Sequence, residues 1–415
     1  MAERRALVVG RALAAQTAAL LLARRGWSVV LVGGPSPQPD APHFLNDAAL
    51  RVLREELPGL EQELLSRGAR RQSVAMSLRQ DFGPAAELRP DDDAVAMLCC
   101  RAALIHDALR RRVKAAPGIA ERDEPAVGFL NEGPRVVGVR TASGGLRADA
   151  VIDAAGASSP RRALLAAAGL PADRVATWGP RYAALTRFYG HAGEGPHFRL
   201  IARDGARGGS LPVERGSFAV NFILPERLLP SDSEGRRTFF ERLADAVPGA
   251  RAHMRRPTTE LRLTRGLVSM ESDFYRAGSP AAALEGLYPL GDAVWSSNPI
   301  YARGYSLALL QAAALTRSLE EPTPGAARRA QARALARLRP LWRAGAFNEL
   351  ADAPVLSSPG ALAARAARGY FMRVLEPRMR RDPDLLRRFL LMYHLRLPPW
   401  RVATLRQHAA ALLLR

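Results

Sequence analysis

The sequence predicts an α/β fold: a parallel sheet covered by helices, with a mainly β region inserted and a helical region at the end. Three observations predict it. Apolar strand patterns alternate with alanine- and leucine-rich helical patterns near the start, period-two alternation dominates the middle, and helical spacing dominates the end. We place the parallel-sheet domain at residues 1–80, 98–165 and 281–320, the β domain at 81–97 and 166–280, and the helical region at 321–415.

The first element is a strand–helix–strand unit over residues 6–32, in which an apolar run ends at Gly10. Near-continuous apolar strands and small helix residues suit a parallel pair with a buried crossover helix. The unit is typical of a Rossmann-like domain. Helical spacing follows over 48–67, and residues 73–89 fit either a strand pair or an irregular excursion. A helix over 100–113 precedes a strand, a glycine turn and an apolar strand over 134–156, which we expect to rejoin the first sheet.

The β region alternates with period two, as in "SFAVNFIL". Phe218, Val220, Phe222 and Leu224 share one face, but alternation does not decide which face lines a pocket. Tyr182 and Phe222 are the candidate substrate contacts, and Val220 is left unassigned.

Composition excludes several classes of protein. With 48% hydrophobic and 24% charged residues, the 415-residue chain is typical of a globular protein. The net charge of +20 is spread over nearly every helix as arginine, which predicts solvated helix faces rather than a nucleic-acid site. The only cysteines, Cys99 and Cys100, are chain neighbours, so we expect no disulfide and a cytoplasmic location. No stretch has the length of a spanning helix.

The first unit carries a reduced nucleotide-binding motif. A pyrophosphate needs small residues at the start of a helix, usually GxGxxG, and an acid after the second strand to hold a ribose. Here the three glycine positions hold Gly10, Ala12 and Ala15, so only the first glycine of the motif remains. Gly33 stands where the acidic residue is expected. Leu13 and Ala14 complete the candidate phosphate-facing turn.

Two later motifs are stronger. "DAAGASSPRR" supplies Asp153 and Gly156 after an apolar strand, and "GDAVWSSNPIYARGYSLALL" supplies Gly291, Asp292 and Pro299 before a helix that opens at Gly304. A helix that starts after such a loop directs its free N–H groups into the adjoining cleft. A purely structural role, in which an aspartate caps a helix, explains single residues of these motifs but not the order in which they occur.

Together these motifs resemble the FAD-dependent aromatic-hydroxylase-like monooxygenases, in particular the branch similar to squalene epoxidases. The resemblance spans most of the chain and implies a Rossmann-like FAD-binding domain. It implies that Arg101, in "CRAAL", contacts FAD, that Asp292 faces the ribityl and pyrophosphate region, and that the helix from Gly304 faces the flavin pyrimidine. It also implies a hydroxylation or epoxidation of a small apolar organic substrate, with NAD(P)H as reductant.

The chain departs from that family pattern at several flavin contacts. The family has an acid where Gly33 stands and a basic residue in the loop "PDAPHFLND"; it has Gly-Gln-Gly-Met at residues 302–305. Arg303 would add a cation near the flavin, and Tyr305 is bulkier than methionine. Two functions therefore stay open: a working monooxygenase, or a homologue with weakened or lost FAD binding that acts as a non-redox cyclase, isomerase or metabolite-binding protein.

The C-terminal helices combine leucine and arginine. This pattern fits either packing against the body of the protein or peripheral membrane contact.

Overall fold

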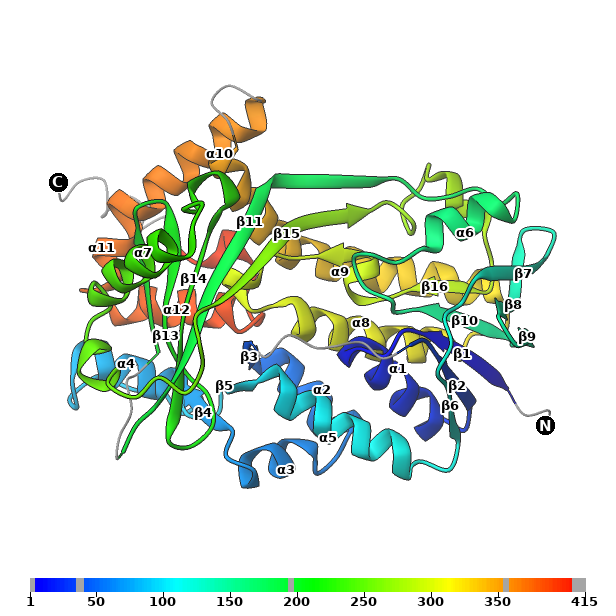
Figure 1. Cartoon of the computed structure of the whole chain (residues 1–415), viewed down its shortest axis with the longest axis horizontal. Coiled ribbons are helices and arrows are strands. Elements are labelled where there is room, and N and C mark those ends of the chain that lie inside the picture. Colours follow the sequence, from blue (N-terminus) through cyan, green and yellow to red (C-terminus); the bar gives the residue numbers. More distant parts are fainter. Residues whose placement is uncertain (1–3, 35–40, 193–197, 354–357, 405–415) are drawn as a thin grey trace.

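The structure, a computed structural model, describes residues 4–34, 41–192, 198–353 and 358–404. Residues 35–40 lie outside this described part. The parallel sheet lies toward the N-terminus, and the antiparallel sheet and the C-terminal helices lie on the other side (Figure 1). The predicted fold class is confirmed, including the inserted β region and the helical C-terminal region.

The parallel sheet has five strands in the order β16-β10-β1-β2-β6. All four strand pairs are parallel, so the carboxyl ends of the strands share one edge. The central strands are buried on both faces, which explains their continuous apolar letters. The strands are β1 (Arg5–Val9), β2 (Ser28–Val32), β6 (Ile119–Arg122), β10 (Ala150–Asp153) and β16 (Leu287–Pro289).

Helices α1 (Leu13–Arg24), α5 (Ala102–Ala115) and α8 (Gly304–Ser318) pack together against this sheet in one core. The buried alanines of α1 and α8 let these two helices approach closely. A second core includes residues of a three-stranded meander and of helix α6. These elements are β7 (Gly128–Glu132), β8 (Arg135–Thr141), β9 (Gly144–Arg147) and α6 (Arg161–Ala167).

The second sheet has the order β12-β13-β14-β11-β15-β17 and is antiparallel throughout. Helix α7 (Ser233–Asp245) shares a core with Phe218, Val220, Phe222 and Leu224, so this face of β14 is turned to α7. Ile223 packs on the opposite face with Tyr182 and Ile300. The strands are β11 (Val175–Gly190), β12 (Arg199–Arg203), β13 (Ala206–Pro212), β14 (Ser217–Pro225), β15 (Arg262–Ser272) and β17 (Trp295–Ser296).

Residues 73–89, where the sequence fits a strand pair or an irregular excursion, contain a helix instead. Helix α4 (Val74–Phe82) begins where the Ser73 hydroxyl accepts a hydrogen bond from the Met76 N–H at 3.1 Å. Val74 and Leu78 then share a buried face. The strand that precedes this helix, β4 (Arg70–Ser73), belongs to a three-stranded sheet with the order β3-β5-β4. The other two strands are β3 (Pro42–Leu45) and β5 (Ala96–Arg101).

The C-terminal region is helical. Leu385 and Leu386 of α12 pack with Val74 and Leu78 of α4, so packing against the body explains the apolar stripe of that helix. Among the described residues, no helix is both long and apolar enough to cross a membrane. The helices are α9 (Pro324–Glu349), α10 (Pro359–Tyr370), α11 (Glu376–Met379) and α12 (Pro383–Tyr393).

Candidate functional site at the sheet edge

Three segments leave the parallel sheet at one edge, after β1, β10 and β16. Gly10 follows β1 with a φ of +123°, and a Cβ there would stand 2.5 Å from the Ala154 carbonyl oxygen. Because no side chain fits that distance, the chain passes from β1 toward α1 directly beside the end of β10. This edge therefore gathers the motifs that the sequence singled out.

The turn after β16 is held by both neighbouring helices. Gly291, with a φ of +64°, donates its N–H to Gln311 Oε1 of α8 at 2.9 Å. A Cβ on Gly291 would lie 3.1 Å from Ala14 Cβ in the first turn of α1. The turn thus fits between α1 and α8, and it sets the position of Asp292.

Asp292 points toward the start of α8. One carboxylate oxygen lies 3.9 Å from the point where a Cβ of Gly304 would stand, and Ser297 Oγ lies 3.3 Å from the same point. Solvent reaches the Asp292 side chain, yet the protein crowds it on its other sides, and this poor hydration raises its pKa to about 6. Asp292 also lines a small recess together with Gly156, Arg162 and Met270.

The segment before α8 is shaped by local backbone geometry. The Asn298 side chain accepts a hydrogen bond from the Ile300 N–H at 3.0 Å and starts the turn Pro299–Tyr301 (η5). Ala302 then adopts a left-handed conformation with a φ of 47°, which is strained by about 1 kcal/mol in a residue with a Cβ. No side chain in the described ranges caps α8, so its first N–H groups stay free at Gly304.

Three buried polar atoms of this segment have no hydrogen-bond partner among the described residues. They are Ser297 Oγ, Asn298 Nδ2 and Arg303 Nε. Unpaired buried polar atoms are rare in folded proteins and often mark a position that a ligand or a water completes. We call the set Asp292, Ser297, Ala302 and Gly304 the α8 end of the site.

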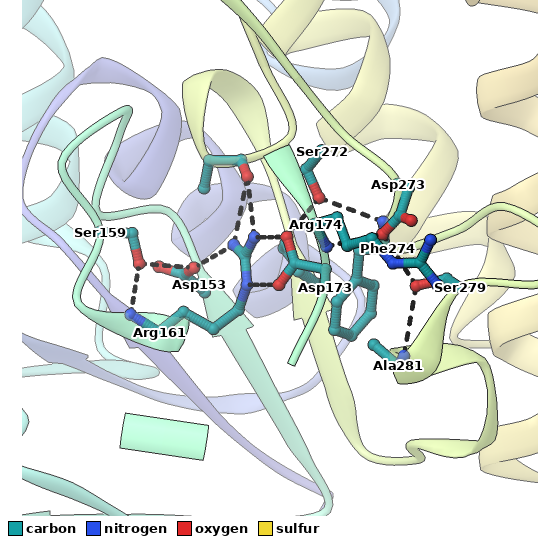
Figure 2. Close-up of polar contacts among 12 residues, drawn as sticks. Asp153, Ser159, Arg161, Asp173, Arg174, Ser272, Asp273, Phe274, Ser279 and Ala281 are labelled. Carbon is teal, nitrogen blue, oxygen red and sulfur yellow. Dashed lines mark hydrogen bonds and ion pairs between the residues drawn. The ribbon is translucent and has the colours of Figure 1, made fainter. Parts of the chain in front are cut away.

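A buried charge network supports the α8 end from behind. Arg161 is 3% exposed and pairs with Asp153 at 2.6 Å and with Asp173 at 2.7 Å (Figure 2). It also donates two hydrogen bonds of 3.1 Å to the Ala293 carbonyl, one residue after Asp292. The network therefore anchors the Asp292 turn to the loop after β10.

The Asp153 carboxylate is fully engaged in this network. Besides Arg161, it accepts hydrogen bonds from the Ser159 hydroxyl at 2.8 Å and from the Ala155 N–H at 3.2 Å. Gly156 continues the same loop with a φ of +84°. The structure gives Asp153 an internal, structural set of partners, and a direct contact of Asp153 or Gly156 with a cofactor stays a prediction.

Two further predicted cofactor contacts, Arg101 and Tyr305, also have partners within the protein. Arg101 contacts Glu214 through its backbone N–H at 2.9 Å and its Nε at 3.2 Å, and its guanidinium lies over the Phe188 ring. The Tyr305 hydroxyl forms a 2.8 Å hydrogen bond with the Thr17 hydroxyl of α1, and its ring is in the main core.

Arg303 is directed toward the C-terminal helices. Its guanidinium donates to the Leu341 carbonyl at 3.5 Å and the Met392 carbonyl at 3.3 Å, and it lies near the Tyr301 and Tyr393 rings. Burial lowers the pKa of the Arg303 guanidinium. These contacts tie the start of α8 to α9 and α12.

The other end of the sheet edge, which we call the β2 end, consists of Arg11, Gly33, Glu121 and Asp123. Arg11 follows Gly10, and its Nε donates to the Gly33 carbonyl at 3.0 Å. Its two terminal nitrogens form ion pairs with Glu121 and Asp123 at the end of β6. Ala12, Leu13 and Ala14 start α1 beside it, and no side chain of the described residues caps that helix.

Sequence reasoning did not single out Arg11. The sequence did contain a signal: a basic residue, Arg11, stands inside the glycine motif, while the acidic residue expected at Gly33 is missing.

The two candidate substrate residues lie on opposite faces of the second sheet: the Tyr182 hydroxyl donates to Asp352 at 2.8 Å, and the Phe222 ring packs against Phe240 of α7.

A second group that sequence reasoning missed lies behind η5. Glu349 is 1% exposed and accepts a hydrogen bond of 2.9 Å from the Ser269 hydroxyl, which in turn accepts one of 3.0 Å from the Asn298 N–H. Burial raises the pKa of Glu349 to about 8, so this carboxyl is protonated at neutral pH. It thereby supports the turn that precedes Ala302.

The fold matches solved flavoproteins, although no family model and no curated protein sequence matches the chain. PqsL, a probable FAD-dependent monooxygenase from Pseudomonas aeruginosa, has a TM-score of 0.66 at 19% identity, over 88% of this chain and 100% of PqsL. The flavin-dependent brominase Bmp2 has a TM-score of 0.64 at 13% identity, over 94% of this chain and 92% of Bmp2.

The tetrameric form of 2-methyl-3-hydroxypyridine-5-carboxylic acid oxygenase has a TM-score of 0.58 at 20% identity, over 88% of this chain and 96% of that protein. The chain therefore has the fold of flavin-dependent monooxygenases, as its motifs predict.

Proposed function

We propose that the protein is a flavin-dependent monooxygenase that hydroxylates or epoxidises a small, largely apolar organic molecule. The observation that carries the proposal is the α8 end. Three features meet there: the solvent-accessible carboxylate of Asp292, the left-handed backbone of Ala302 and the uncapped start of α8 at Gly304. The fold is shared with flavin-dependent monooxygenases. The unpaired Ser297 Oγ and Asn298 Nδ2 fit a site that a ligand completes.

The α8 end suits the ring-bearing half of a flavin. Asp292 would accept hydrogen bonds from ribityl hydroxyls, and the first N–H groups of α8 would face the electron-rich pyrimidine edge. A bound flavin supplies the redox chemistry of oxygen activation, and the protein supplies position and electrostatics. In the overall reaction NAD(P)H provides two electrons, one oxygen atom of O2 enters the substrate, and the other leaves as water.

The substrate region that we favour is the face of the second sheet turned to η5. An apolar cluster lies there, formed by Tyr182, Ala184, Ile223, Leu267 and Ile300, and Ile300 is two residues before Ala302 in the chain. An apolar wall beside the flavin would hold an apolar substrate and exclude water. PqsL has been crystallised with 2-aminobenzoylacetate, a small organic acid, which is consistent with a substrate of this size.

The non-redox alternative is not favoured, because the α8 end keeps its strained backbone, its accessible acid and its unpaired polar atoms.

We also propose a cytoplasmic location, which the two free cysteines support. Peripheral membrane contact stays a proposal for the exposed Trp400, which is 67% accessible near the C-terminal end of the described chain.

The test is a flavin titration of the purified protein followed by absorbance between about 350 and 500 nm. We expect saturable binding, and consumption of O2 that requires NAD(P)H, flavin and an organic substrate. Asp292→Ala should weaken flavin binding about 10- to 100-fold, because it removes a charge-assisted acceptor.

The control for Asp292→Ala is Asp91→Ala, which removes an exposed carboxylate in the loop before β5. It should leave flavin affinity unchanged. A protein that ignores flavin in both the oxidised and the reduced state would refute the proposal.

A further inference from the structure

The Arg11 side chain fills the β2 end of the site. Its Nε donates to the Gly33 carbonyl, and its terminal nitrogens reach Glu121 and Asp123. A Cβ on Gly33 would stand 3.4 Å from Arg11 Cγ, so the arginine stem lies directly over this glycine. The side chain is only 11% exposed, which indicates that its neighbours enclose it.

A dinucleotide-binding fold normally holds the adenosine ribose at this position. The acid that binds the ribose stands after the second strand, about 20 residues beyond the glycine turn. Gly33 is 22 residues beyond Arg11 and directly follows β2. Here the same place holds a guanidinium whose hydrogen bonds are already made within the protein.

An adenylate would therefore have to displace the Arg11 side chain. Displacement would break both ion pairs, and it would leave Glu121 and Asp123 facing the added nucleotide without their cation. Both carboxylates would then repel the anionic phosphates. The backbone also disfavours the acidic residue that normally binds the ribose at this position, because Gly33 has a φ of +155°, which side chains rarely adopt.

The α8 end shows no such closure. Solvent reaches Asp292, and Ser297 Oγ has no partner among the described residues. We propose that the protein binds a flavin that lacks the adenylate, with FMN and riboflavin as representatives, and that Arg11, Glu121 and Asp123 form a latch that excludes the adenylate of FAD. The inference rests on the proposed function and narrows its ligand class.

The experiment compares FMN, riboflavin and FAD as ligands of the full-length protein. Each is titrated in its oxidised form and, under anaerobic conditions, in its dithionite-reduced form, with calorimetry and flavin fluorescence as readouts. We expect FMN to bind at least as tightly as FAD. We also expect that AMP does not compete with FMN.

Opening the latch should favour FAD selectively. Arg11→Ala should tighten FAD binding about tenfold and leave FMN binding unchanged. The double variant Glu121→Gln with Asp123→Asn removes the ion pairs while keeping every side chain length, and it should act in the same direction. Arg24→Ala, the same substitution at the exposed far end of α1, should change neither affinity.

The outcomes separate the two proposals. If FAD binds more tightly than FMN and Arg11→Ala weakens FAD binding, then Arg11 holds the nucleotide, and the inference fails while the proposed function stands. If no flavin binds in either oxidation state, both proposals fail.

Discussion

The two ends of the sheet edge are built from different kinds of interaction. Behind the α8 end, Arg161 lies between two carboxylates and is 3% exposed, with a carbonyl as a third acceptor. At the β2 end, Arg11 also meets two carboxylates, but Asp123 is 80% exposed. Buried, fully bonded charges fix a position, whereas exposed ion pairs contribute little and exchange easily. The chain therefore supports the α8 end with a buried charge network and the β2 end with ion pairs to carboxylates that solvent reaches.

The largest expected effect tests the α8 end. Arg161→Met should lower the free energy of unfolding by about 3–5 kcal/mol, because it leaves Asp153 and Asp173 buried without their cation. Urea unfolding measures the change. Arg162→Met is the matched control, since that neighbouring arginine is exposed, and it should shift stability by less than about 0.5 kcal/mol. If Arg161→Met destabilised the protein no more than Arg162→Met, the buried network would not hold the α8 end in place.

A smaller effect concerns the protonated carboxyl behind η5. The pKa of Glu349 is raised from an ordinary 4.5 to about 8, so between these values the folded protein keeps a proton that the unfolded chain releases. Stability conferred by the neutral Glu349 is complete below about pH 4.5 and falls as pH rises toward 8.

Glu349→Gln keeps the contact with Ser269 but carries no titrating proton. We expect the free energy of unfolding of the variant, relative to that of the parent, to increase with pH across this window by a few kcal/mol, with a parallel rise in its relative melting temperature. Thermal melts in a series of buffers measure it. A difference that does not depend on pH would show that Glu349 is ionised in the folded protein.

The smallest expected effect is the pH dependence of flavin affinity at Asp292. Its pKa is about 6 and only the carboxylate is a strong acceptor, so affinity should rise as pH increases through 6, by at most about tenfold between pH 5 and 7. Asp292→Asn should give a weaker and flat profile. A rising profile in that variant would assign the titration to another group.

Much of the fold was predictable because it depends on local patterns. Continuous apolar strands, the alanine-rich helix α1 and the period-two alternation of β14 each follow from burial on two faces or on one. Helix α4 was missed because its start depends on a single serine cap and its apolar face on contacts with α12, which is distant in the sequence.

The site was predictable only where it follows the chain. Asp292 and Gly304 lie in one motif, so their convergence could be anticipated. Arg11 and Glu121 are 110 residues apart, and the partners of Arg161 come from three segments, so sequence order did not reveal either cluster. Likewise, the direction of Arg303 depends on carbonyls of α9 and α12.

The 2.5 Å separation at Gly10 changes how the remnant of the phosphate motif is understood. That glycine is demanded by the contact between two neighbouring strands, whatever ligand the protein binds. A search for nucleotide-binding signatures would count it as a partial match, although sheet packing alone accounts for its presence. In this chain the residue that follows it, Arg11, is therefore the position at which nucleotide selection is to be tested.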